Sequence, residues 1–185
     1  MKELSLNVLD ITENSVKAGA SLTEILIWES DSELTITIKD DGCGMPEHIV
    51  RSVTDPFYTT RTTRSVGLGI PLFKMAAEQT GGGIEIFSKV DDGKGGEHGT
   101  VVKASFYKNH LDFTPLGDVG STVITLIQGH PDVDFLFVHE TEGGTVRLDT
   151  REVRQVLEGV PLDTYEVLKW IEEYIAEQYS EFNKK

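Results

Sequence analysis

The chain is poor in cysteine, in long apolar runs and in basic residues. Its 185 residues include one cysteine, Cys43, which cannot form an intramolecular disulfide and has no neighbouring thiol or histidine pair for a structural zinc site. No run of about 18 apolar residues suggests a transmembrane helix, and the first residues lack the basic start and apolar centre of a signal peptide. These absences predict a cytoplasmic protein that is not bound to a membrane.

Acidic residues outnumber basic ones along the whole chain. The net charge is -14, with 16 acids against 10 bases in residues 1–107 and 15 against 7 in residues 108–185. Nucleic acids bind clusters of Lys and Arg through their phosphates, so nucleic-acid binding is not expected. One segment differs from the rest, because residues 51–74 contain four basic residues and a single acid, Asp55.

What the sequence does contain is enough apolar residues, 38%, for one hydrophobic core. Their spacing predicts helices over residues 4–18 and 69–79 and a short helix after Pro46. The first helix is expected to bury Leu6, Leu9, Val16 and Ala20. Alternating and β-branched residues predict strands over 21–30, 32–41, 84–90 and 100–107, each consecutive pair forming a hairpin.

A boundary near Asn109 divides the chain into residues 1–108 and a C-terminal α/β extension, residues 109–185. In the extension, residues 116–129 have helical spacing, although their β-branched residues leave a strand open. A hairpin follows over residues 134–150, and two helices open with the pairs Asp149 and Glu152, then Asp163 and Glu166. The last helix has an apolar stripe that is expected to pack on its own domain, with a partner interface as the alternative: Val167, Leu168, Ile171, Tyr174 and Ile175.

Polar residues line one edge of the first predicted helix. Asp10 and Asn14 are one turn apart and Lys17 lies three residues further, so the three side chains can point into one cleft. The alternative is a solvated face with an ion pair between Glu13 and Lys17.

Three other segments could complete such a cleft. Asp40 ends a strand in K-D-D-G-C-G-M, where Gly42 and Gly44 either allow a flat ligand close to the backbone or form a simple turn. The segment DPFYTTRTTRSVGLGIPLF runs into the start of a helix, where free N–H groups bind phosphates and Arg61 and Arg64 could neutralise them. The pair Gly99-Thr100 begins a later strand.

In this order, these segments resemble the nucleotide-binding domain of gyrase B subunits, heat-shock chaperones of the ninety-kilodalton class, histidine kinases and MutL proteins, the GHKL family. ENSVKAGA is similar to the N box, DDGCGM to the first glycine box, VGLGIPL to the second glycine box, and GT to the last adenine-side motif. DPFYTT resembles the segment before the ATP lid. The resemblance covers residues 5–107 and implies an α/β fold, an α+β two-layer sandwich in which a Bergerat-type mixed sheet has helices on one face.

The resemblance also implies ATP and Mg²⁺ as ligands. Asn14 would coordinate Mg²⁺ beside the phosphates. Asp40 would accept a hydrogen bond from the adenine amino group, with Thr100 sharing a nearby water. Phosphate contacts would come from Lys17, from one of Arg61 and Arg64, and from the glycine-box residues Gly67, Leu68 and Gly69.

The chain departs from the family pattern at two positions. Asp10 stands where hydrolysing relatives have Glu and histidine kinases have Asn, so a carboxylate base is present on a side chain one methylene shorter. Ser65 replaces a glycine found in many relatives. The resemblance therefore leaves both hydrolysis by Asp10 and the lid geometry as expectations.

Two functions remain open from the sequence. In the first, the chain hydrolyses Mg-ATP or transfers its γ-phosphate to a separate protein, because the N box begins almost at Met1 and leaves no phosphoacceptor helices before it. In the second, ATP controls a non-catalytic interaction switch in signalling, with residues 109–185 recognising a protein partner.

Other motifs do not fit. VGLGIP has no strand before it, as a dinucleotide fingerprint would need, and no GxxxxGK followed by Ser or Thr occurs. The five histidines are expected at the surface or in packing, and Cys43 is expected to fill space near the adenine, with a redox role as the alternative.

Overall fold

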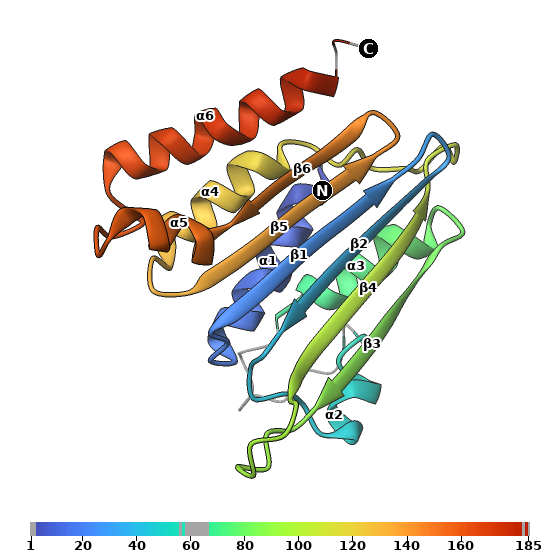
Figure 1. The fold of residues 1–185 in the computed structure, drawn as a ribbon. Helices are drawn as coiled ribbons and strands as arrows, with labels where there is room; N and C mark the ends of the chain where they lie inside the picture. Colours follow the sequence, from blue (N-terminus) through green and yellow to red (C-terminus); the bar gives the residue numbers. More distant parts are fainter. Residues whose placement is uncertain (1–2, 56, 58–66, 183, 185) are drawn as a thin grey trace.

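The computed structural model describes residues 3–55, 57, 67–182 and 184 of the chain (Figure 1). In chain order the elements are α1 (Leu4–Lys17), β1 (Leu22–Glu29), β2 (Glu33–Asp40), α2 (Glu47–Ser52), α3 (Gly69–Glu78), β3 (Gly83–Lys89), β4 (Gly99–Tyr107), α4 (Val119–Gly129), β5 (Asp134–Thr141), β6 (Gly144–Asp149), α5 (Thr150–Leu157) and α6 (Tyr165–Phe182). The helices and strands predicted from periodicity are confirmed, including the helix in residues 116–129 whose type was open. None of the described helices is both long and apolar enough to cross a membrane.

The strands form one mixed sheet in the order β3-β4-β2-β1-β5-β6. The pairs β1–β2, β3–β4 and β5–β6 are antiparallel hairpins, and β1 and β5 pair in parallel. Along β2 the apolar residues Leu34, Ile36 and Ile38 are buried, and the residues between them are more exposed. This alternation explains why the segment forms a strand with one face against a core.

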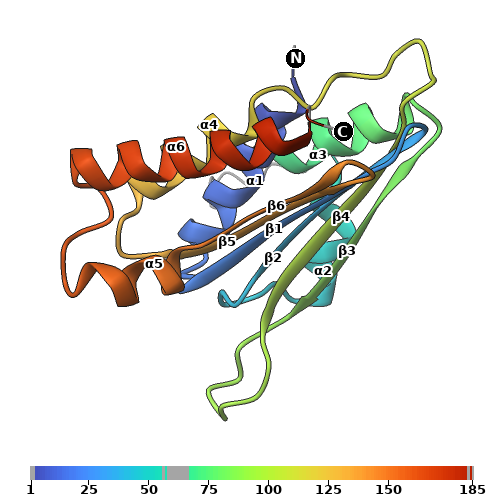
Figure 2. The ribbon, with the colours of Figure 1, turned by 45° about the horizontal axis from the view of Figure 1, so that its top comes forward.

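Helices α1, α3, α4 and α6 cover one face of the sheet (Figure 2). This arrangement confirms the predicted two-layer fold with helices on one face. The prediction of which α1 side chains are buried was partly wrong. Leu6 is 47% exposed, whereas Leu4, Val8 and Ile11 are buried, because α1 is packed against α3 and α4 as well as the sheet.

Residues 109–185 extend the same sheet. Strand β5 adds beside β1, with Leu26 opposite Val138, and the buried residues of α4 and α6 belong to the same hydrophobic core as those of α1. In α6 the predicted stripe packs inward at Val167, Ile171 and Ile175, but Tyr174 is 38% exposed. The division at residue 108 remains a prediction.

The two predicted helix starts differ from expectation in detail. Asp149 accepts a hydrogen bond from the backbone N–H of Arg151 and so caps α5, but Glu152 pairs with Arg147 rather than returning to the cap. Helix α6 begins at Tyr165, one residue later than a cap at Asp163 would give.

A buried polar network joins β5 and α6 to β1. His139, 5% exposed, lies 2.9 Å from Oε2 of Glu29 and 2.8 Å from the hydroxyl of Tyr179, and Lys108 donates to Glu29 at 2.7 Å. Burial lowers the pKa of His139, although the carboxylate of Glu29 opposes the shift. Burial would raise the pKa of Glu29, but hydrogen bonds from Lys108 and His139 bring it below its ordinary value.

Candidate nucleotide-binding site

Asp40, the last residue of β2, has a buried carboxylate that accepts hydrogen bonds from three segments. Its Oδ2 accepts from the hydroxyl of Ser15 on α1 at 2.7 Å. Its Oδ1 accepts from the backbone N–H of Gly42 at 2.9 Å and of Thr100 at 3.2 Å. The predicted adenine residues Asp40, Gly42 and Thr100 therefore lie together at one end of the sheet.

Ser88 is a residue of this region that the sequence analysis missed. Its hydroxyl oxygen accepts from the backbone N–H of Met45 at 2.7 Å and lies 2.8 Å from the hydroxyl of Thr100 and 3.1 Å from the carbonyl of Gly99. Ser88 thus ties the loop after Asp40 to the start of β4. The register could have indicated it, because Ser88 pairs with Thr100 across the β3–β4 hairpin.

His98, which was expected at the surface or in packing, packs against the glycine loop. Its Nδ1 lies 2.6 Å from the carbonyl oxygen of Gly42, and its Nε2 lies 3.7 Å from the carboxylate of Asp91. A carbonyl oxygen only accepts hydrogen bonds, so Nδ1 carries a proton and donates it. His98 therefore fixes the peptide whose neighbouring N–H binds Asp40.

Gly42 and Gly44 are required by contacts within the protein itself. Gly44 has φ +71°, and a Cβ atom there would lie 2.0 Å from the carbonyl oxygen of Lys89. A Cβ atom at Gly42 would lie 2.9 Å from Cβ of Ala18. Close approach to a ligand is thus not needed to explain either glycine. Cys43 between them is exposed and does not fill the interior, contrary to expectation.

The N-terminus of α3 meets the polar edge of α1. A Cβ atom at Gly69 would lie 3.2 Å from Cβ of Asp10 and 4.0 Å from Nδ2 of Asn14. Leu68 precedes the helix and makes no side-chain cap. Within the described part of the chain the N–H groups of Gly69 and Ile70 have no acceptor outside the helix. Such an uncapped start can bind an anion.

Partial desolvation by the surrounding protein raises the pKa of the Asp10 carboxyl although its side chain reaches the surface; Lys17 lowers the pKa in part and Glu13 raises it further. Asp10 and Lys17 are exposed, and Asn14 is half-buried. The structure thus brings Asp10, Asn14 and Gly69 together, and Lys17 is close enough to Asp10 to lower the pKa of its carboxyl in part. Gly67 and Leu68 lie at the surface beside this group.

The oxygens of Asn14 and Asp10 suit a hard cation. Among the described residues no group of three or more His, Cys, Asp or Glu side chains could hold a metal by itself. These residues therefore fit Mg²⁺ only if phosphate and water supply the remaining oxygens.

Some predicted features lie elsewhere. Arg61, Arg64 and Ser65 fall outside the described residues. A cavity of about 530 Å³ adjoins Asp40. The strand residues that line this cavity point their side chains to the sheet face opposite α1: Glu24, Lys39, Phe87 and Val101. The carboxylate of Asp40 points the other way, toward Ser15, so the sheet separates this cavity from Asp10 and Asn14.

Comparison with known proteins agrees with the geometry. Residues 2–110 match the family model described as histidine kinase-, DNA gyrase B-, and HSP90-like ATPase. The chain belongs to this family. As a GHKL protein it carries an ATP-binding domain, and the residues clustered around Asp10 and Asp40 all lie inside the matched segment.

The similar curated proteins are kinases and sensor proteins of bacteria. Sporulation kinase A of Bacillus subtilis is 30% identical over 108 residues, which are 58% of this chain and 16% of that protein. The sensor protein SrrB of Staphylococcus aureus is 36% identical over 99 residues, 50% of this chain and 17% of that protein. The chain thus spans less than a fifth of the length of these relatives.

Solved structures share the GHKL fold. The Aquifex aeolicus MutL ATPase domain complexed with ADP has a TM-score of 0.52 and 17% identity, over 85% of this chain and 70% of that chain. The N-terminal domain of a DNA repair protein has a TM-score of 0.55 and 17% identity, over 80% of this chain and 53% of that chain. Since 85% of 185 residues extends well past residue 110, the shared fold includes part of residues 109–185.

Proposed function

We propose that the chain binds Mg-ATP between α1, the end of β2 and the start of α3, and that its γ-phosphate passes to water or to a separate protein. One observation carries this proposal: two consecutive residues of α1 face the two halves of the site. Asn14 lies beside Gly69 and Asp10, and Ser15 donates to Asp40 at 2.7 Å. A single helix therefore fixes the distance between an adenine-binding carboxylate and a phosphate-binding helix start.

Each end of the nucleotide meets residues of suitable chemistry. Asp40 accepts a hydrogen bond from the adenine amino group, and Thr100 holds a water beside it. The N–H groups of Gly69 and Ile70 bind phosphate oxygens, and Lys17 adds a positive charge. Asn14 would hold Mg²⁺, which supplies charge neutralisation to the phosphates when bound. Arg61 or Arg64, both outside the described residues, would add a phosphate contact.

Asp10 acts as the base in hydrolysis. Its carboxylate takes a proton from a water molecule while the water oxygen bonds to the γ-phosphorus and the bond to the bridging β–γ oxygen breaks, releasing ADP and phosphate. Partial desolvation raises the pKa of Asp10, so the carboxylate ionises at a higher pH than usual. Phosphate release is therefore expected to rise with pH through the titration of Asp10.

The names of the relatives favour phosphotransfer to a protein as the other outcome. Sporulation kinase A and the sensor protein SrrB are named as a kinase and a sensor, which supports a signalling role. We place the phosphate acceptor on another chain. Within this chain His139 is 5% exposed on strand β5, so it is not accessible as an acceptor.

The substitution Asp10→Asn tests hydrolysis. The variant should bind ATP as well as the wild type does, because the amide keeps the size of the side chain, but phosphate release should fall by about 100-fold or more because the base is lost. Release is measured with a phosphate assay and binding by calorimetry. Unchanged release would refute the role of Asp10. ATP binding without any release by the wild type would instead support the alternative, an ATP-controlled interaction switch.

A further inference from the structure

A cavity of about 360 Å³ lies between β6, α5 and α6, outside the segment that matches the ATPase family. Its apolar walls are formed by Leu148, Val153, Val156, Leu157, Trp170 and Tyr174. Trp170 and Tyr174 stack with ring centroids 5.1 Å apart and planes 8° apart. The stack holds one aromatic wall in a fixed orientation although Trp170 is 50% exposed. We call this cavity the α5–α6 groove.

Exposed apolar side chains are concentrated around the α5–α6 groove. Of the 14 large hydrophobic residues exposed in the described part of the chain, three line the groove, namely Val156, Trp170 and Tyr174, and two more, Val160 and Tyr165, lie between them in the sequence. Val156 is 82% exposed and also lines the groove. Clustered apolar surface of this kind marks an interaction site, and Trp, Tyr and Arg dominate binding energies at such sites.

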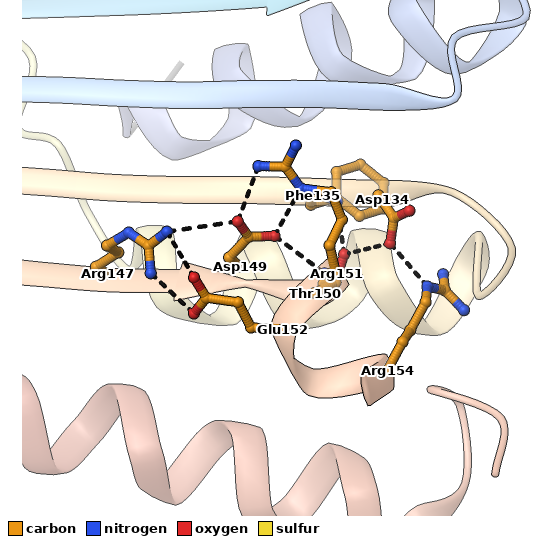
Figure 3. Close-up of polar contacts among 8 residues, drawn as sticks. All are labelled: Asp134, Phe135, Arg147, Asp149, Thr150, Arg151, Glu152 and Arg154. Atoms are coloured by element: carbon orange, nitrogen blue, oxygen red, sulfur yellow. Dashed lines mark hydrogen bonds and ion pairs between the residues drawn. The ribbon is translucent and has the colours of Figure 1, made fainter. Parts of the chain in front are cut away.

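The polar rim of the groove is held in place by ion pairs (Figure 3). Arg147 donates to both oxygens of Glu152 at 2.9 and 3.0 Å and to Asp149 at 3.4 Å. Arg151, which does not line the groove, donates twice to Asp149, at 3.0 and 2.8 Å, and so holds this rim carboxylate from the other side. Two-point pairs of this type fix side-chain geometry. The rim is therefore organised before any partner binds, and its arginine, Arg147, is neutralised.

The backbone beside the groove does not favour an added strand. Strand β6 is an edge strand of the sheet. The side chain of Gln178 on α6 accepts from the N–H of Arg147 at 2.9 Å and donates to its carbonyl at 3.0 Å. These are two of the outward backbone groups that a further strand would use. A partner would thus bind through side chains that enter the groove.

The helices that form the groove carry an excess of acidic side chains, which favours a basic partner. Residues 152–181, which include most of α5 and all but the last residue of α6, contain eight exposed acids. Glu152 pairs with Arg147 and Glu181 with Lys184, and six have no ion pair among the described residues: Glu158, Asp163, Glu166, Glu172, Glu173 and Glu177. The same range contains two bases, Arg154 and Lys169, and Arg154 donates to Asp134 at 2.7 Å. We propose that the α5–α6 groove binds a segment of a partner protein that inserts an aliphatic or aromatic side chain and flanks it with Lys or Arg. Charge complementarity to the exposed acids selects this occupant over an acidic one.

The groove is tested by fluorescence anisotropy with a labelled synthetic amphipathic peptide of leucine and lysine, titrated with the full chain. The peptide should bind saturably, and Val156→Ser should raise Kd by about tenfold because it removes an apolar wall. Trp170→Ala should do the same. Val90→Ser, at an exposed valine outside the groove, is the matched control and should leave Kd unchanged.

Three results would overturn the proposal. The first is equal binding by Val156→Ser and the control. The second is equal binding of a sequence-scrambled peptide or of a leucine–glutamate peptide. The third is self-association in sedimentation velocity that Val156→Ser abolishes, since the occupant would then be a second copy of the chain. None of these outcomes depends on ATP binding.

Discussion

Asp40 and Asp41 are neighbouring carboxylates with different surroundings. Asp40 accepts hydrogen bonds from Ser15, Gly42 and Thr100 around the nucleotide site. Asp41 instead accepts from the backbone N–H groups of Ser21 and Leu22 at 2.8 and 3.0 Å. Burial would raise the pKa of Asp41, but these hydrogen bonds lower it overall. Asp40 is the carboxylate proposed to bind adenine, whereas Asp41 fixes the start of β1.

His98 is expected to support nucleotide binding through Gly42. His98→Ala removes the donor to the Gly42 carbonyl and should weaken ATP binding by about fivefold, the effect of one lost hydrogen bond of about 1 kcal/mol. His98→Asn can donate from the same position as Nδ1 and should restore most of the affinity. Calorimetry with ATP measures both variants, and equal weakening by Asn and Ala would show that the hydrogen bond is not the cause.

Local sequence patterns identified the candidate site residues whose positions depend on a single helix or strand. Asp10 and Asn14 follow from helical spacing, and Asp40 follows from its place at a strand end. Ser15, Ser88 and His98 could not be found in this way, because their partners are 25, 43 and 56 residues away in the chain. Their roles arise only when the sheet register brings distant segments together.

At the scale of whole elements, the type of each helix and strand was easier to predict than its orientation. Period and length identify an amphipathic helix, but the buried side depends on which neighbours pack against it. Helix α1 contacts the sheet and two other helices, so Ser5 and Asn7 are buried while Leu6 is exposed. The parallel pairing of β5 with β1 could not be predicted from the sequence either, because no local sequence feature of the two strands specifies it.

The loop between β2 and α2 depends on Gly44. Gly44→Ala should reduce the free energy of unfolding by about 2 to 3 kcal/mol, because φ is +71° and the new Cβ atom would strike the carbonyl of Lys89. Gly83→Ala is the matched control, because its Cβ atom would meet nothing within 4 Å. Urea denaturation compares the two, and similar midpoints would contradict the close contact.

Across the whole molecule, the network of His139, Glu29, Lys108 and Tyr179 links the ATPase segment to residues 109–185. The chain is expected to lose stability as pH falls from about 7.5 to 5.5. Because burial lowers the pKa of His139 in the folded state, the unfolded chain takes up the proton first as pH falls through 6.5, the ordinary value. The lowered pKa of Glu29 acts in the same direction, but only near and below its ordinary value of 4.5.

Urea midpoints measured across this range test the network. His139→Gln removes the titrating imidazole and should make the urea midpoint less dependent on pH. His48→Gln, at an exposed position on α2, should leave the pH dependence of the midpoint unchanged. A wild-type midpoint that rises on acidification would contradict the direction of the His139 shift. The same slope in wild type and His139→Gln would assign the dependence to other groups.

A single chain is proposed to enclose ATP between the end of β2 and the start of α3. The most direct measurement is calorimetry with ATP and ADP, with and without Mg²⁺, for the wild type, Asp40→Asn and the matched variant Asp41→Asn. Asp40→Asn should weaken binding by more than about tenfold, or about 1.4 kcal/mol, while the affinity of Asp41→Asn should stay near that of the wild type. Wild-type protein that releases no heat with either nucleotide, or equal affinities for both variants, would contradict the proposed binding.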